Sequence, residues 1–567
     1  MVIRSRKSSI VKILDSLNKN FPTLDFKESS GLLHVNLDNI IVYDVVKLLK
    51  KDFGFIFLLD IFATDHLNDY SSGKCEKRFT VTYHLLHLEE HKRISVNVDL
   101  NEHETIQSFS ELWLNSKWPE REIAEMFGIN FENHQTSKLL TSDYIIGYPL
   151  RKDWVYQAKS HQDLVFKKPE FSWLPEIGDD ERLCRQVIDL SPSHPAIQGT
   201  FVVRAEVLGN KVKRALVEIG LQHRGVEKIS ESKHYGQFIP YAERLNFSSP
   251  MMGAIAWAKT VEEAIEIEMT DRCQALRMIM MELSRVLDHS TSLAAMAQDL
   301  RAWDASVIFQ RIRSHVSALF LSYTGSRLMG SSVRIGGMVH DLPIGWVTKC
   351  LDAIYLIQTE LKEILSILNR APSWLVFHGE GGMNAAQAIE WGFSGPCLRA
   401  CGVNYDLRKN SPYYFYQDVE FEVPLGINGD PYDRYLVRVE EMQQSLKIVS
   451  QVLDHIPSGS VQTEDPRLAK TTGSLRLTSA DYAKHFDLYQ NGTKINAGSY
   501  YSFIESANGE LGFYIRSDGS GIPYRTRVRA PSFFHFQSFC DSIQNVSLES
   551  ATAILSSLNA ISGEIDR

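Results

Sequence analysis

Cysteine is sparse and scattered in this chain. The 567 residues include seven cysteines, and no two of them form a CxxC pair. Such a set offers no cysteine cage for a metal, and in a chain of this length it predicts reduced thiols in a cytoplasm-like compartment.

Positively charged residues are not in excess either. The net charge of -9 argues against a general polyanion binder, so we expect no nucleic-acid partner.

Long apolar runs are also missing. The most apolar stretch, FGFIFLLDIFA from Phe53, is interrupted by Asp60 and falls well short of the roughly 20 residues that cross a bilayer. Residues 6–18 carry apolar side chains at helical spacing, which predicts a surface helix rather than a signal peptide. We therefore expect the chain to lie outside the lipid.

The common nucleotide, zinc and hydrolase motifs are absent from the sequence. It has no phosphate loop, Rossmann glycine fingerprint, zinc-binding helix or GxSxG elbow. It has instead polar loops punctuated by glycine, namely SPSHPAIQG, LQHRGVEK, SRLMGSSVRIGGMVHDLP and SDGSGIPYRTRVRAPS. Glycine lets the backbone approach a bulky partner, and arginine can neutralise charge there. Taken alone, the residues favour a structural role for His194 in a turn, and structural roles are also open to Tyr235, Arg224 and Arg334.

The spacing of apolar residues divides the chain in two. Strict alternation in FTVTYHLL and ISVNVDL predicts a hairpin over 79–100, and helical spacing follows at 119–127. We assign residues 1–154 to a small α/β domain, 155–185 to a charged, aperiodic linker, and 186–567 to a second domain.

The second domain is predicted to be mainly helical with a small hairpin region. Residues 201–219 alternate weakly around a Gly-Asn turn, which is typical of a hairpin. Helical spacing appears at 347–370 and 433–454. Thr270 can cap another long helix, whose apolar stripe is predicted to be core: Leu276, Ile279, Met280, Leu283, Val286 and Leu287. The predicted fold class is α+β.

Two groups of motifs resemble a known family. WPEREIAEMFGINFENH and GYPLRKD resemble the C-type subunit of the proton-pumping NADH:quinone oxidoreductase, respiratory complex I. Six further segments resemble motifs of the D-type subunit of the same complex and occur in the same order: HPAIQG, GLQHRGVEK, RIGGMVHDLPIGW, WGFSGPCLRACGVNYDLRK, SDGSGIPYRTRVRAPSF and SLNAISGEIDR. This order and the single linker resemble the fused C/D polypeptide of some bacteria.

The resemblance implies that the second domain folds like the large subunit of nickel-iron hydrogenases. Those enzymes hold nickel through two CxxC pairs, because nickel there needs soft thiolate ligands. The matching positions here are Asn246 and Ser249 in ERLNFSS, and Ile561 and Glu564 in SLNAISGEIDR. All four thiolates are missing, so a hydrogenase is disfavoured and we assign no metal ligand.

The resemblance also implies the residues of a quinone site. The family uses a histidine and a tyrosine, which match His194 and Tyr235, and a carboxylate that orients the histidine, which matches Asp299. Arg224 and Arg334 match arginines that lie near the iron–sulfur cluster of a partner.

The implied assembly is the peripheral arm of complex I. Electrons from the terminal 4Fe-4S cluster of a B-type subunit would reduce quinone at this chain, coupled to proton translocation. An I-type ferredoxin-like subunit, other peripheral-arm subunits and the membrane H-type subunit would be further partners. The chain would bind no cofactor by itself, would be inactive alone, and would lie on the cytoplasmic side of the bacterial inner membrane.

Two positions depart from the family pattern. Gln198 replaces the second histidine of HPxxHG, and Met329 replaces a histidine that usually neighbours the cluster. Glutamine can still hydrogen-bond but cannot titrate. A divergent scaffold subunit without full quinone chemistry therefore stays open as an alternative.

Overall fold

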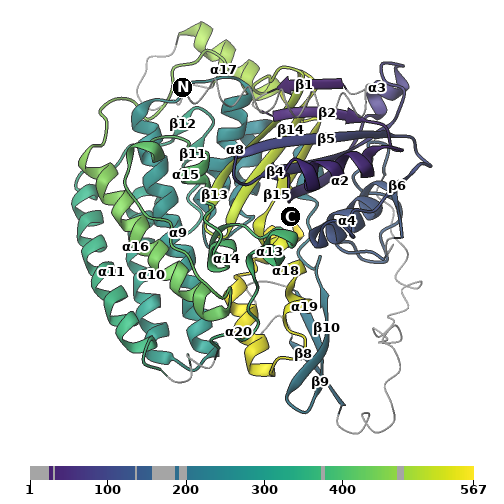
Figure 1. The fold of residues 1–567 in the computed structure, drawn as a ribbon. Helices are drawn as coiled ribbons and strands as arrows, with labels where there is room; N and C mark the ends of the chain where they lie inside the picture. The colour runs from purple at the N-terminus through teal and green to yellow at the C-terminus, as the bar shows by residue number, and fades with distance from the viewer. Residues whose placement is uncertain are drawn as a thin grey trace. The chain divides into compact units, whose positions relative to one another are not determined.

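The computed structural model describes residues 25–29, 32–133, 137–155, 185–190, 201–371, 374, 377–468 and 478–567, with 25–29 and 185–190 described by their backbone. The chain forms two compact units, Met1–Leu164 and Val165–Arg567, which are described separately below. Residues 156–184 lie outside the described part, so the domain boundaries at 154 and 185 remain predictions. Figure 1 labels the helices and strands.

The first unit is built on a five-stranded sheet with the strand order β1-β2-β5-β4-β3. β2 and β5 pair in parallel, and the other neighbours pair antiparallel. Phe79 lies opposite Leu100 and Val81 opposite Val98, which confirms the predicted hairpin. The strands are β1 Asp25–Ser29, β2 Leu32–Leu37, β3 Phe57–Asp65, β4 Phe79–His87 and β5 Lys92–Leu100.

Short helices accompany this sheet. The helical spacing at 119–127 is confirmed by α4, which ends at Gly128 in the left-handed conformation with φ 73°. The surface helix predicted over 6–18 lies outside the described residues. The remaining elements of this unit are α2 Val42–Asp52, α3 Leu67–Ser71, β6 Thr105–Gln107, η1 Leu114–Ser116, α4 Lys117–Phe127 and β7 Asn130–Glu132.

The second unit contains two three-stranded sheets, in the orders β10-β9-β8 and β13-β14-β15. The first confirms the hairpin predicted over 201–219, which turns at Gly209 with φ 64°. The second was not predicted from the sequence. The strands are β8 Arg185–Leu190, β9 Val202–Leu208, β10 Lys211–Glu218, β11 Val333–Arg334, β12 Gly337–Met338, β13 Gly498–Ser506, β14 Gly509–Ser517 and β15 Arg525–Arg529.

Helices make up most of the rest of this unit. The predictions at 347–370 and 433–454 are confirmed by α11 and α16. The helices are α6 Val226–Ser230, η4 Tyr235–Phe238, α7 Ile239–Glu243, α8 Pro250–Ala264, α9 Asp271–Asp299, α10 Trp303–Thr324, α11 Trp346–Leu368, α13 Ala385–Glu390, α14 Gly395–Ala400, α15 Leu407–Asn410, η5 Tyr416–Asp418, α16 Pro431–Asp454, α17 Ser479–Asn491, α18 Pro531–Gln537, α19 Phe539–Ser542, α20 Leu548–Leu558 and α21 Ser562–Asp566.

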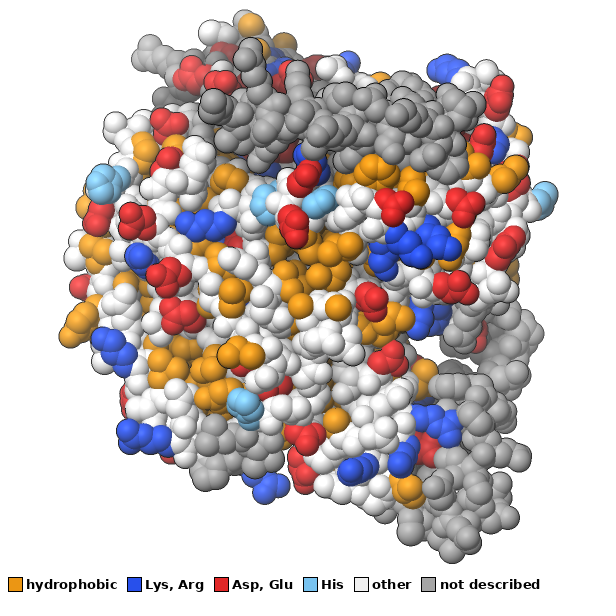
Figure 2. Space-filling model, in the orientation of Figure 1, with side chains coloured by type: hydrophobic (Ala, Val, Ile, Leu, Met, Phe, Trp, Pro, Cys, Tyr) orange, Lys and Arg blue, Asp and Glu red, His pale blue; other side chains and the backbone are white. Residues whose placement is uncertain are grey.

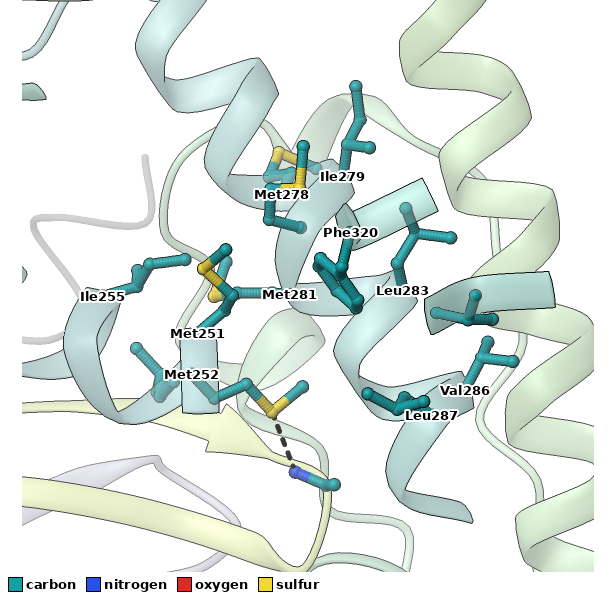
Figure 3. Packing of buried hydrophobic residues seen from close by; sticks show 14 of the residues in the cluster. Met251, Met252, Ile255, Met278, Ile279, Met281, Leu283, Val286, Leu287 and Phe320 are labelled. Atoms are coloured by element: carbon teal, nitrogen blue, oxygen red, sulfur yellow. Dashed lines mark hydrogen bonds between the residues drawn. The ribbon is translucent and has the colours of Figure 1, made fainter. Parts of the chain in front are cut away.

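The core of the second unit is centred on α9. Thr270 caps this helix by accepting a hydrogen bond from the backbone N–H of Cys273 at 3.3 Å, as predicted. α8, α10, α16 and α20 all pack against α9, and its predicted stripe is buried. Methionine and aliphatic side chains of α8 and α9 interdigitate there (Figure 3), and the Met252 sulfur accepts from the Ala507 N–H at 3.2 Å. The methionines of α8 and α9 are therefore core residues.

None of the described helices combines the length and the apolar character needed to cross a bilayer. On the face drawn in Figure 2, apolar side chains gather in patches between acidic and basic ones.

Candidate functional site

His194 and Gln198 lie in the stretch 191–200, outside the described residues. Their positions relative to Tyr235 and Asp299 therefore remain predictions. The other four predicted site residues are described.

Tyr235 begins the short helix η4, and its side chain has no solvent exposure. Its ring stacks on that of Trp257, with centroids 6.3 Å apart, and the Trp257 indole N–H donates to the Tyr235 carbonyl at 2.7 Å. The Tyr235 hydroxyl has no hydrogen-bond partner among the described residues. Burial raises the pKa of this hydroxyl well above its ordinary value, although the nearby Ser517 hydroxyl lowers it, so the group keeps its proton and can donate a hydrogen bond.

Asp299 is the last residue of α9 and is half-buried. One carboxylate oxygen, Oδ2, is buried without a hydrogen-bond partner in the described part of the chain. Burial raises the pKa of Asp299 to about 7, although the nearby Ser556 hydroxyl lowers it. This carboxyl group can therefore gain or lose a proton near neutral pH.

Arg334 is an exposed residue of β11, and its backbone is hydrogen-bonded to a buried side chain. The buried guanidinium of Arg277 donates to the carbonyls of Arg334 at 2.9 Å and Gly337 at 3.2 Å. Glu262 pairs with Arg277 through two bonds of 2.6 and 2.7 Å and accepts from the Gly336 N–H at 2.7 Å. This buried ion pair fixes the turn between β11 and β12.

A cavity of about 730 Å³ brings the Arg334 turn and the Tyr235 turn together. Gly236 and Gln237, the residues after Tyr235, line it, while the Tyr235 side chain does not. Asp299 and Arg224 are not among its lining residues. Its polar wall includes His234, Gln237, Arg334, His340 and His485.

Arg224 is exposed, and it follows a loop whose backbone is hydrogen-bonded to Asp566 in the C-terminal segment. The Asp566 carboxylate accepts from the backbone N–H of Gly220 at 2.8 Å and of Gln222 at 2.7 Å. The His223 ring nitrogen Nδ1 lies 2.6 Å from the Asp566 carbonyl oxygen. Asp566 thus holds the residues that directly precede Arg224.

Three of the four positions that match hydrogenase cysteines meet in one buried polar network. The Asn246 amide donates to Glu564 at 3.1 Å, and both Asn246 and Ser249 donate to Asp288. Ile561 is buried and apolar. Among the described residues no group of His, Cys, Asp and Glu is arranged to hold a metal ion. Asp288 was not predicted from the sequence, in which it follows the stripe residue Leu287 directly and has no other signal.

Comparisons with known proteins identify the family. The family described as "Respiratory-chain NADH dehydrogenase, 49 Kd subunit" matches residues 299–567, and "Respiratory-chain NADH dehydrogenase, 30 Kd subunit" matches residues 35–160.

Single proteins give the same result. The chain is 39% identical to the fused C/D polypeptide of the NADH-quinone oxidoreductase of Bdellovibrio bacteriovorus over 92% of each chain. It is 30% identical to the corresponding C/D polypeptide of Aeromonas hydrophila, over 95% of this chain and 92% of the relative. It is 37% identical to the D-type subunit of the same oxidoreductase in Pelobacter propionicus, covering 71% of this chain and 100% of the relative. The chain therefore belongs to the C/D family of NADH-quinone oxidoreductase subunits, as the sequence motifs predicted.

Proposed function

We propose that this chain is the peripheral-arm subunit of complex I at which electrons from a partner's terminal 4Fe-4S cluster reduce quinone, coupled to proton translocation. Family membership over most of the chain supports the assignment to the complex. The observation that carries the quinone chemistry is the Tyr235 hydroxyl, which is buried without a partner among the described residues, in a turn that lines a large cavity. A buried hydroxyl that forms no hydrogen bond is available to a ligand.

Quinone reduction consumes two electrons and two protons, so the headgroup needs proton donors at its carbonyls. Tyr235 would donate a hydrogen bond to one carbonyl, and His194 would serve the other. Asp299 would orient and charge His194. Its pKa of about 7 and its unpartnered oxygen support a role in holding a proton near neutral pH.

Electrons would arrive from outside the chain. Arg224 and Arg334 are both exposed, so their guanidinium groups are accessible to a cluster-bearing B-type subunit, where positive charge favours the reduced cluster. The I-type ferredoxin-like subunit and the membrane H-type subunit would complete the surroundings, on the cytoplasmic side of the inner membrane. The chain alone would show no NADH oxidation and no quinone reduction.

Substitution of the two proposed donors tests this function. We expect His194→Ala and Tyr235→Phe each to reduce inhibitor-sensitive quinone reduction by the assembled complex at least tenfold, because each variant loses one proton donor. Tyr355→Phe, which removes the hydroxyl of an exposed tyrosine of α11, is the matched control and should leave turnover unchanged.

The alternative is a scaffold subunit without full quinone chemistry, which Gln198 and Met329 favour because neither side chain titrates. Unchanged turnover in both His194→Ala and Tyr235→Phe would exclude the catalytic role and leave the scaffold. Stoichiometric nickel in the purified chain would instead support the hydrogenase hypothesis.

A further inference from the structure

Two buried carboxyl groups from distant parts of the chain share one amide donor. Asp288 lies on α9 and Glu564 on α21, and both side chains are at most 1% exposed. The Asn246 Nδ2 donates to Asp288 Oδ2 at 2.9 Å and to Glu564 Oε1 at 3.1 Å. Both carboxyl groups therefore lie within hydrogen-bond reach of the same nitrogen.

The orientation of the Asn246 amide is fixed by the backbone. Its Oδ1 accepts from the N–H of Ser248 at 2.9 Å and of Ser249 at 3.3 Å. Because this oxygen is occupied by two donors, the amide cannot rotate without breaking both bonds. Its two N–H groups stay directed at Asp288 and Glu564.

The remaining hydrogen bonds to this pair come from neutral groups. Asp288 accepts from the Ser249 hydroxyl at 3.1 Å and from the Asn559 Nδ2 at 2.7 Å. Glu564 accepts from the hydroxyl of Ser532 and from its backbone N–H at 3.3 Å. Neither carboxyl group forms an ion pair with a described residue.

The charged and titratable groups on the packed elements bond elsewhere. On α9, Arg285 donates to the carbonyls of Glu505 and Ser506, and His289 pairs with Glu441 of α16 at 2.9 Å. Arg434 and Arg438 of α16 bond to Ser557, and His535 of α18 accepts from the Ser394 N–H. Asp566 of α21 accepts from the Gly220 N–H. Burial keeps the pKa of His535 well below its ordinary value, so this ring is neutral.

Two buried negative charges without a cation are strongly disfavoured. Desolvation penalises each charge, and their mutual repulsion adds to the cost, so such a pair retains a proton. Burial, with the charge of Asp288 in addition, raises the pKa of Glu564 to about 7 against the lowering effect of the Ser532 hydroxyl.

The neighbouring side chains can accept a hydrogen bond from a proton on either carboxyl group. The Asn559 Oδ1 and the Asn508 Nδ2 are buried without partners in the described structure, while the Asn559 Nδ2 donates to Asp288. If both carboxamides rotate by half a turn, Asn559 presents an oxygen to a protonated Asp288 and to the Asn508 Nδ2. A proton on Glu564 can instead be donated to the Ser532 hydroxyl oxygen.

We propose that Asp288, Asn246 and Glu564 form a proton-binding site that holds one proton in mildly acidic solution and releases it as the pH rises through neutrality. The site is separate from the proposed quinone residues His194, Tyr235 and Asp299, and its proton uptake needs no quinone. It gives the chain an internal store of one proton.

Infrared difference spectroscopy of the purified full chain, recorded across a titration from pH 6 to 9 without quinone, tests this site. We expect one component of the protonated-carboxyl absorption to disappear with rising pH in the wild type and to be absent at all these pH values in Glu564→Gln, while the component from Asp299 remains in both. Asp288→Asn removes the second charge, so the band should disappear at least one pH unit lower. Asp352→Asn, at an exposed position of α11, is the control and should leave the band unchanged.

The pH dependence of unfolding gives a second measurement on the same variants. A carboxyl pKa raised by folding stabilises the protein at low pH, and this contribution is lost as the pH rises through the folded pKa. The denaturant midpoint of Glu564→Gln should therefore fall less than that of the wild type between pH 5 and 8. Carboxyl absorption that titrates in Glu564→Gln and Asp288→Asn as it does in the wild type, with parallel midpoints, would overturn the proposal. Because no quinone is present, this outcome would leave the proposed function untouched.

Discussion

Tyr235 combines a fully buried ring with a hydroxyl that no described residue bonds. Because an unsatisfied buried hydroxyl costs free energy, its removal should not destabilise the fold. We expect Tyr235→Phe to leave the free energy of unfolding unchanged or to raise it by about 1 kcal/mol. Chemical denaturation of the purified chain measures this, and a clear loss of stability would show that the hydroxyl has a structural partner.

Asp299 should give the chain a measurable pH dependence. Its pKa is about 7 in the folded chain, against an ordinary value of 3.8, so folding favours the protonated form. The wild type should lose stability as the pH rises from about 4 to about 7, with a slope of at most about 1.4 kcal/mol per pH unit from this group. Asp299→Asn should flatten that slope when unfolding midpoints are compared across the range. An identical slope in the variant would contradict the assignment.

At the scale of elements, the β11–β12 turn depends on a buried ion pair from two helices. Arg277 of α9 and Glu262 of α8 are almost fully buried, and together they bond to the backbone of Arg334, Gly336 and Gly337. Loss of one partner leaves a buried charge without its counter-ion, and this lowers the free energy of unfolding far more than loss of an ion pair at the surface does.

We therefore expect Arg277→Met to destabilise the second unit by about 3–5 kcal/mol, because Glu262 would keep a buried charge without its cation. The double variant Arg277→Met with Glu262→Gln should recover part of this loss, because no buried charge remains. Denaturant unfolding of the variants compares the two. If the double variant is no more stable than the single one, the bonds to the turn, rather than the charge, determine the stability.

At the scale of the whole molecule, the chain consists of two units that are each compact. The D-type relative from Pelobacter propionicus is covered completely by 71% of this chain, so the second unit has a counterpart that exists as a separate chain. We expect Met1–Leu164 and Val165–Arg567, expressed separately, each to unfold cooperatively on heating, because each has its own buried core. Circular dichroism of the two fragments checks this, and a fragment without a cooperative transition would show that its core needs the other unit.

The sequence by itself determined the elements whose signal is local. The alternation of apolar and polar residues predicted the hairpin of β4 and β5. Thr270, followed by an apolar stripe at helical spacing, predicted the start of α9. The ordered motifs also predicted the family, because they can be compared position by position without a structure. The roles of His194, Tyr235, Asp299, Arg224 and Arg334 remain predictions from those motifs.

Only the tertiary structure decided where polar residues become buried. β15 has the sequence RTRVR, which resembles an exposed segment, yet all five residues are buried, and Glu227 of α6 supplies an ion pair to Arg525 at 2.7 Å. Asp288 likewise acquires its environment from Asn246 and Glu564, which are remote in the sequence. A buried charge is tolerated or kept protonated according to the partners that folding brings to it, and those partners have no local signal in the sequence.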